Sequence, residues 1–362
     1  MSNFTSKPKF FTFLIIAGLF MVSFNIEAQV KKAFTPRYTG TIKGDVTIIA
    51  NNMLSEHKTN SFNGSGDNQD NNNRVFVDID SDGSTFNSSS ANLADPDPGL
   101  ACKEFVRAYL YWAASDKEAG GVSSNSESWN YDPGKLMLPG SSSYATITAD
   151  EVLYRGRSEH FHNDPYINFK DITALVNGLD TPYGKYQIAN VKATWGGLEP
   201  HGGGNYGVAG GWQIVFVYQS TQLTTRNITL FDGYAHVDNG ATTDFNVNGF
   251  LSIPSGHVKA DIVLGAIEGD RVLNDDSFQI KKPNGSWQKI STPLRNEDNF
   301  FNSRISINGA NFTNRNPAST NTLGYDASIF ELSNPSNSLI ANNQTSTTLR
   351  ATSGNESYGL YL

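Results

Sequence analysis

The chain has a single cysteine, Cys102, among its 362 residues. One thiol excludes an internal disulfide and a cluster of thiolate ligands around a metal ion. The neighbouring letters in "ACKEFVRAYLYW" are largely apolar, which predicts that Cys102 is a buried small hydrophobic side chain and not a reactive thiol. Without disulfides, a chain of this length must build a large hydrophobic core, and its 22 Phe and 15 Tyr can supply one.

Long apolar runs are also scarce. The longest, residues 10–24, follows Lys7 and Lys9 and precedes Ala28, which is the order found in a secretory signal peptide. We therefore expect residues 1–28 to be removed and the mature chain to be exported to the cell surface or beyond, with the periplasm as the alternative location. An uncleaved N-terminal anchor is the competing interpretation. No later segment is long and apolar enough to form a membrane-spanning helix.

Positively charged residues are fewer than negatively charged ones. The formal net charge is −8, from 27 Lys and Arg against 35 Asp and Glu, and no basic tract interrupts the chain. Nucleic acids and anionic membranes attract clusters of Lys and Arg, so neither is an expected partner.

Helical periodicity is nearly absent, and one short helix is expected, in "DITALVNGL" with Asp171 as its cap. Strand alternation is frequent, as in "RVFVDID", "HVKADIVLG" and "RISIN". "EFVRAYLYW" and "GWQIVFVYQ" are continuously apolar, which is typical of central strands covered on both faces. "SFQIKKPNGSWQKI" predicts a hairpin, with Asn284 and Gly285 in a type I′ turn.

Long Asn/Ser/Gly/Asp loops separate these strands: "NGSGDNQDNNN", "GGVSSNSESWNYD" and "NRNPASTN". Such residues hydrogen-bond locally, so we expect these loops to interrupt regular structure and not to pack. The pattern predicts an all-β fold of the β-sandwich or jelly-roll-like kind. We expect two packed sandwich domains, residues 29–222 and 223–362, the second incomplete at its C-terminal end; one larger sandwich is the alternative.

The segment "HGGGNYGVAGGW", residues 201–212, matches two enzyme signatures by letter. A dinucleotide-binding fingerprint requires a helix after its glycines, whereas a strand-like run follows here. An esterase oxyanion loop requires a G-x-S-x-G nucleophile turn downstream, and none occurs. We interpret the segment as a glycine loop that joins "KYQIANVKATW" to "GWQIVFVYQ" as antiparallel strands.

Two acidic stretches are candidate calcium sites. "DIDSDGS" places Asp78, Asp80 and Asp82 at alternate positions before a glycine, as calcium loops do. It is not an EF-hand, because Ser89 stands where the bidentate Glu would be, so distant oxygens such as those of Asp95 or Asp97 would have to complete the site. The alternative is an acidic strand end followed by a solvated turn.

The second and weaker calcium candidate is "EGDRVLNDDSF", which contains Glu268 and Asp270 and, further on, Asp275 and Asp276. Arg271 is expected to neutralise part of its charge.

Three further constellations carry less weight. His160 and His162 are two residues apart, as at the start of a cupin metal site, but the Glu that should follow is missing, which favours a surface pair. Glycoside hydrolysis requires two facing carboxylates, and no spacing in the sequence identifies a pair. The carboxylates and aromatic side chains that we considered for glycan chemistry are Asp232, Asp238, Glu268, Asp270, Trp129, Trp195 and Trp287.

A family resemblance rests on motifs that occur in this order: "KAFTPRYTGTIKGDVTIIANNML", "DIDSDGSTFNSSSANL", "RAYLYWAASDKE", "PYINFKDIT", "GGWQIVFVYQS", "ITLFDGYAHV", "GAIEGDR", "FFNSRI" and "NRNPASTNTLGYDASIF". Together they resemble the N-terminal region of very large secreted surface proteins of Bacteroidetes. Those proteins continue into repeated sandwich modules and a gliding-motility-associated, type IX secretion sorting domain. The chain stops at "ESYGLYL" with no such sorting domain, so we expect a fragment; a short freestanding version exported by another route is the alternative.

The resemblance implies a cell-surface, adhesin-like role. We therefore expect a non-enzymatic exported module, stabilised by calcium, with surface glycans or environmental polymers as partners. The alternative is a carbohydrate-binding or glycan-cleaving sandwich module.

Overall fold

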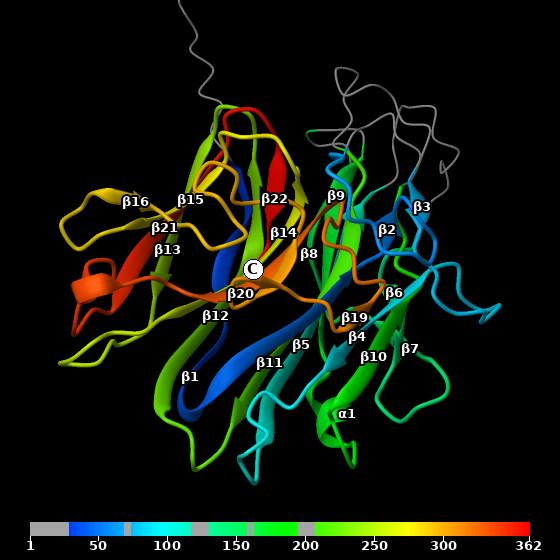
Figure 1. Ribbon diagram of the computed structural model, residues 1–362, viewed down its shortest axis with the longest axis horizontal. Helices are drawn as coiled ribbons and strands as arrows, with labels where there is room; N and C mark the ends of the chain where they lie inside the picture. The colour runs from blue at the N-terminus through cyan, green and yellow to red at the C-terminus, as the bar shows by residue number, and fades with distance from the viewer. Residues whose placement is uncertain (1–28, 69–73, 117–129, 158–159, 161–162, 195–206) are drawn as a thin grey trace, which may run out of the picture.

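A computed structural model of the protein describes residues 29–68, 74–116, 130–157, 160, 163–194 and 207–362; the expected signal peptide lies outside them. Nearly all regular elements are β-strands, which assemble into packed sheets, so the predicted all-β sandwich class is confirmed (Figure 1). None of the described helices is long and apolar enough to cross a membrane.

Strand β1 connects the two halves of the molecule. It spans Gln29–Asn52, and its residues 29–43 pair with β12 (Thr225–Val237) on one edge. Its residues 44–52 pair with β11 (Gly210–Gln219) on the other edge. The long strand that runs through the centre of Figure 1 therefore belongs to both halves.

An eleven-stranded sheet results, in the order β18 (Ala310–Asn311), β17 (Ile305–Ile307), β20 (Gly324–Glu331), β14 (Asp261–Gly269), β22 (Tyr358–Leu360), β12, β1, β11, β5 (Glu104–Ser115), β9 (Asp164–Asp171), β8 (Glu151–Arg157). A five-stranded sheet has the order β19 (Arg315–Asn316), β4 (Ser88–Leu93), β10 (Gly184–Ala189), β6 (Pro133–Met137), β7 (Ala145–Thr148). A four-stranded sheet has the order β13 (Thr242–Asn248), β21 (Ser346–Thr352), β15 (Ser277–Lys281), β16 (Trp287–Lys289). The small elements are β2 (Leu54–Ser55), β3 (Val75–Phe76), helix α1 (Thr173–Asn177) and a 3-10 turn at Pro335–Asn337.

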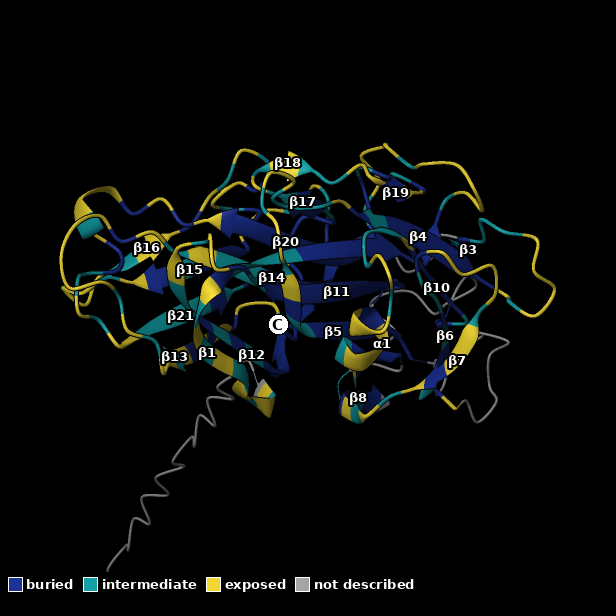
Figure 2. Cartoon of the chain, turned by 90° about the horizontal axis from the view of Figure 1, so that it is seen from below, coloured by how far each residue is buried: buried dark blue, intermediate teal, exposed yellow. Residues whose placement is uncertain are grey.

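Strand alternation distributes side chains over three hydrophobic cores. In β11, Trp212, Ile214 and Phe216 face the five-stranded sheet and form the first core, whereas Val215 and Val217 point the other way into a middle core. The middle core lies between the two halves of the eleven-stranded sheet, and a third core lies under the four-stranded sheet. The molecule is thus four sheet layers deep, with its most buried strands in the centre (Figure 2).

The two halves of the eleven-stranded sheet form the inner layers of the molecule, and they approach each other closely where side chains are smallest. A Cβ atom on Gly211 of β11 would lie 2.5 Å from Cγ of Tyr325 on β20. The Tyr325 hydroxyl in turn lies 2.8 Å from that of Tyr361. Glycine at position 211 therefore lets an aromatic ring of the second half lie flat against the first half.

The expected boundary between residues 222 and 223 falls in the connection between β11 and β12. Because β1 pairs with both strands, the first part of the chain lies with the second half of the molecule and not with residues 44–222. The two expected sandwiches share a strand and a core, and the closing segment supplies the central strand β22 between β12 and β14.

Several local predictions are confirmed. "EFVRAYLYW" and "GWQIVFVYQ" form β5 and β11 and are covered on both faces. Val258 and Leu264 share the third core as alternation requires, although β14 begins only at Asp261. Helix α1 forms, but Ile172 is its N-cap residue; Asp171 lies one position earlier and accepts a hydrogen bond from the Thr173 N–H at 2.9 Å.

The predicted hairpin forms from β15 and β16, but its turn type is wrong. Of the residues at its tip, only Gly285 has a positive φ, at 85°. Pro283 restricts its own φ to negative values, so the chain makes a tight turn closed by a hydrogen bond from Gly285 N–H to Lys282 O at 2.8 Å. The glycine then follows the turn as a bulge residue instead of forming its centre.

Three further predictions are wrong. Cys102 is exposed and has a φ of 55°, because it lies in the turn before β5 and not in the strand. In "RVFVDID" only Val75–Phe76 is a strand. The loop "NRNPASTN" does pack, because Arg315 is buried and its guanidinium donates to the side-chain oxygens of Asn51 and Asn52.

We expect Gly211→Ala to destabilise the protein by about 1–3 kcal/mol, because the new methyl group must displace the Tyr325 ring from the middle core. Urea denaturation of both proteins measures the difference. The control is Gly134→Ala in β6, where the nearest heavy atom to an added Cβ lies at 3.7 Å and little change is expected. Equal effects at the two positions would contradict close packing of the inner layers.

Candidate functional site

The first acidic stretch lies in a turn beside the five-stranded sheet, and its carboxylates already have donors. The Asp78 carboxylate forms an ion pair with Lys58 Nζ at 2.9 Å. Asp82 accepts hydrogen bonds from the N–H and hydroxyl of Ser84, which lower the pKa of its exposed carboxyl below the ordinary value. These contacts are those of a hydrogen-bonded turn.

Asp80 is the most firmly held of the three. It accepts hydrogen bonds from the Tyr144 hydroxyl and the Gln187 amide, each at 2.5 Å. Partial burial acts to raise the pKa of Asp80, but the hydrogen bonds, first that of Tyr144, outweigh it and hold the pKa below its usual value. Asp95 and Asp97, considered as distant ligands, instead contact Lys103 and Tyr218.

The second acidic stretch contributes to a buried cluster, here called the acidic pocket and formed by Glu268, Asp270 and Glu356. Asn68 connects two of its members: its N–H donates to Asp270 Oδ1 at 2.8 Å and its amide donates to Glu268 Oε1 at 3.2 Å. The Asp270 N–H donates to Glu356 Oε2 at 2.9 Å, while Glu356 Oε1 is buried without a hydrogen-bond partner. The three acidic side chains are therefore buried and linked to one another through Asn68 and the Asp270 backbone.

Burial is the main cause of the altered acidity in the pocket. It raises the pKa of Asp270 to about 7 and the pKa values of Glu268 and Glu356 well above their usual value. Repulsion from neighbouring carboxylates adds to each shift, and for Glu356 the largest such contribution comes from Asp276. Asp276 itself is buried and accepts the backbone N–H of Phe301 at 2.8 Å.

The expected neutralisation by Arg271 is not what the structure shows. One Arg271 amino group faces the Asn302 carbonyl oxygen at 3.4 Å, and burial lowers the pKa of this guanidinium. The positive charge that acts on Asp270 is that of Arg74, which is fully buried and forms an ion pair with Glu56. Arg74 and Asn68 lie some 200 residues before the pocket carboxylates in sequence, so no local pattern could have indicated them.

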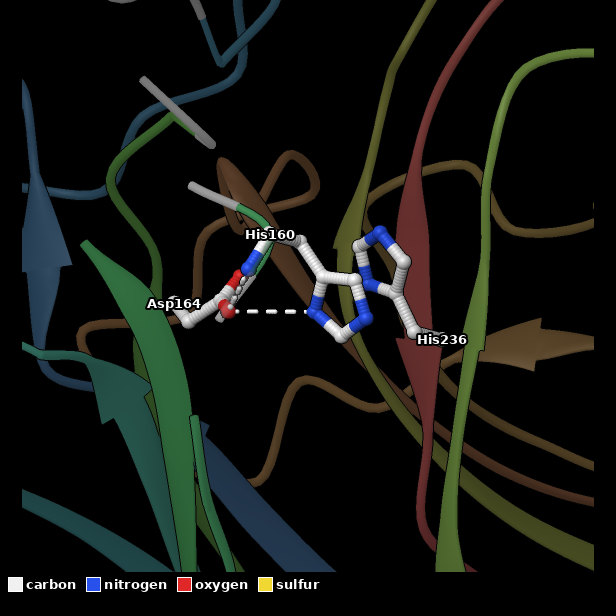
Figure 3. A group of neighbouring side chains, drawn as sticks. All are labelled: His160, Asp164 and His236. Atoms are coloured by element: carbon white, nitrogen blue, oxygen red, sulfur yellow. Dashed lines mark hydrogen bonds and ion pairs between the residues drawn. The ribbon is translucent and has the colours of Figure 1, made fainter. Parts of the chain in front are cut away.

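A third cluster joins the two halves of the molecule through His160, Asp164 and His236 (Figure 3). Asp164 Oδ2 accepts hydrogen bonds from the His160 backbone N–H at 2.7 Å and from its Nδ1 at 3.0 Å. The His160 and His236 rings stack with centroids 4.1 Å apart and planes 12° apart. His162, the expected partner of His160, lies outside the described residues.

These three side chains bring their ligand atoms within 4.8 Å of one another, and they are the only such group among the described residues. A metal ion binds in the plane of each imidazole, along the nitrogen lone pair. Because the two rings are nearly parallel and stacked, no single point lies in both planes. As arranged, the trio is a stacked pair anchored by a carboxylate, and burial lowers the pKa of His236 to about 4.

The carboxylates considered for glycan cleavage have structural partners. Asp232 accepts hydrogen bonds from Arg37 Nε at 2.7 Å and from the Tyr111 hydroxyl at 3.0 Å, and so joins β1, β5 and β12. Asp238 accepts a hydrogen bond from the Ser357 hydroxyl.

Most of the glycine segment lies outside the described residues, as do Trp129 and Trp195. The strands on either side of it, β10 and β11, belong to different sheets and do not pair with each other. Both strands contribute side chains to the first core, each from its own sheet. Trp287 is described: it lies on β16 and is partly exposed.

No protein-family model matches the chain, and no curated protein matches it.

We expect the pocket to make stability pH-dependent. Asp270 has a raised pKa in the folded state, so the folded protein holds a proton that the unfolded chain releases between about pH 4 and about pH 7. This contribution to the free energy of unfolding is complete below pH 4 and decreases as the pH rises toward 7. The free energy of unfolding of Asp270→Asn relative to the unaltered chain should therefore be about 4 kcal/mol larger at pH 8 than at pH 4.

Denaturant titrations at pH 4 and pH 8 provide this comparison. The matched control is Asp180→Asn, which makes the same substitution at an exposed position outside the acidic pocket. A pH-independent effect of Asp270→Asn would show that Asp270 is ionised in the folded protein throughout this range.

Proposed function

We propose that this chain is a non-enzymatic, adhesin-like module of a bacterial cell surface, exported by its N-terminal signal peptide and located at the N-terminus of a larger surface protein. The proposal assigns it the role of a rigid β-sheet body that carries a binding surface outward from the cell.

One observation supports the non-enzymatic role above others. Within the described residues, Asp232, Asp80 and His160, three of the candidate side chains from the sequence, hold strands and turns together. Asp232 contacts Arg37, Asp80 contacts Tyr144, and His160 contacts Asp164. A general acid or base needs a partner at hydrogen-bond distance and an open position for substrate, and these groups are instead occupied by structural contacts.

Protease treatment of intact cells tests the location. An antibody raised against residues 29–362 should detect a polypeptide far larger than 39.5 kDa, and external proteinase should remove it while a cytoplasmic marker persists. A band near the size of this chain that survives until the outer membrane is opened would contradict the proposal and indicate a periplasmic protein.

Calcium stabilisation is part of the proposal, and the acidic pocket is the better of the two candidate sites. Its carboxylates have no cation at ion-pair distance within the described residues, and one buried oxygen of Glu356 has no hydrogen bond. Burying such groups without compensation is unfavourable, and a calcium ion would compensate them once the oxygens close around it. The "DIDSDGS" turn has less to gain, because Lys58, Tyr144 and Ser84 already contact its carboxylates.

We expect millimolar calcium to raise Tm by about 3 °C at pH 8, because an ion that binds only the folded state stabilises it by mass action. Asp270→Asn should abolish the rise, whereas Asp80→Asn should leave it unchanged. At pH 5 protons compete for the same carboxylates and the rise should shrink. The reverse pattern between the two variants would assign calcium to the "DIDSDGS" turn, and no rise in any of them would remove calcium from the proposal.

The second candidate function, a carbohydrate-binding module, is favoured by one feature of the four-stranded sheet. Its outer face carries Trp287 among polar side chains, beside a groove lined by lysines. This feature supplies a ligand class for the surface module and is developed below.

A further inference from the structure

The outer face of the four-stranded sheet carries a polar row that crosses all its strands. Asn246 on β13 pairs with Thr348 on β21, and Lys281 on β15 pairs with Trp287 on β16. The pairing of Ile280 with Leu349 places Lys281 next to Thr348. Alternation turns Phe245 and the neighbouring apolar residues inward to the third core, so this row faces outward.

The row is partly cross-linked and partly open. The Thr348 hydroxyl donates to Asn246 Oδ1 at 3.2 Å. The amino groups of Lys281 and Lys282 form no ion pair or hydrogen bond within the described residues, and neither does the Asn248 side chain. These side chains are therefore available to a ligand.

A groove of about 710 Å³ lies at the end of this face and includes Lys281 and Lys282. None of its lining residues is Asp or Glu; the others on the sheet side include Asn246, Asn248, Ser346 and Thr348. The nearby Asp244 is occupied by Arg350, with hydrogen bonds of 2.6 Å and 2.9 Å. On a chain whose net charge is −8, this groove is a local concentration of positive charge.

Trp287 supplies a stacking surface next to the groove. The Arg350 guanidinium lies 3.8 Å from the centre of the indole and Lys281 Nζ lies 5.8 Å from it. Arg350 is itself held by Asp244, so the indole is supported from one side by an oriented cation. An aromatic ring on the same face as the amides and hydroxyls of β13 and β21 suits a chain of sugars, whose ring faces are apolar and whose rims are polar.

We infer that the groove at Lys281 and Lys282, together with Trp287, binds an anionic polysaccharide carrying carboxylate or sulfate groups. The two ammonium groups would contact the anionic substituents, Asn246 and Asn248 would hydrogen-bond to hydroxyls, and the indole would stack on a sugar ring. The inference gives the proposed surface module its ligand class and rests on that proposal. The two ammonium groups favour an anionic glycan over a neutral one. Double-stranded DNA is the competing polyanion, and equal binding of DNA would overturn the inference.

The test uses the full mature chain and affinity electrophoresis in gels containing polygalacturonate, dextran sulfate, neutral dextran or double-stranded DNA. Retardation is expected with polygalacturonate or dextran sulfate, and not with neutral dextran or DNA. The variant Lys281→Gln/Lys282→Gln should lose about tenfold in affinity, because each ionic contact at the surface is weakened by solvent and the two together supply about one factor of ten. Trp287→Ala should lose about fivefold or more.

The matched control is Lys185→Gln/Lys192→Gln, which removes the same charge from the first half of the molecule and should retain the affinity of the unaltered chain. Equal losses in the two lysine pairs, equal retardation by DNA, or no retardation by either anionic polysaccharide would overturn the inference. Circular dichroism and Tm establish that each variant is folded. Because protease treatment of cells measures location separately, a surface-exposed chain that binds no anionic polysaccharide would refute this inference and leave the proposed function standing.

Discussion

The pairing of β1 on both its edges is the constraint on which the rest of the structure depends. One part of this strand completes the sheet of the second half and the remainder completes the sheet of the first. The two paired segments are consecutive parts of one strand, so the backbone itself joins the sheets of the two halves. The middle core lies against β1, so packing and backbone pairing together hold the two halves. A ligand bound at one end of the molecule is therefore attached to both halves.

Buried polar groups consolidate the same body. Arg315 reaches Asn51 and Asn52 at the end of β1, Arg37 reaches Asp232 across to β12, and Asn68 reaches the acidic pocket after β14. Each contact joins segments that are distant in sequence, and each places a polar group where water is largely excluded. Such contacts are costly when one partner is lost, which makes them determinants of the particular fold more than of its overall stability.

Sequence patterns indicated the parts of this fold that depend on local chemistry. Continuous apolar runs identified β5 and β11, alternation identified the inward faces of β14 and β17, and composition excluded disulfides. Which sheets face one another depends on pairings across 200 residues, and nothing in "KKAFTPRYTG" marks a strand shared by two sandwiches. Glu268 and Asp270 were identifiable as acidic neighbours, but Asn68 and Glu356 could be added only by the fold, as could His236 beside His160.

The position of β22 has a consequence for how the molecule is made. Residues 358–360 form the strand between β12 and β14. β1, the first strand of the described chain, pairs with strands that lie beyond residue 209 in sequence. As the polypeptide emerges from N- to C-terminus, neither inner sheet can be completed from the early strands alone. Such non-local pairing slows folding. The eleven-stranded sheet can therefore close only once the last strand of the described chain has been synthesised.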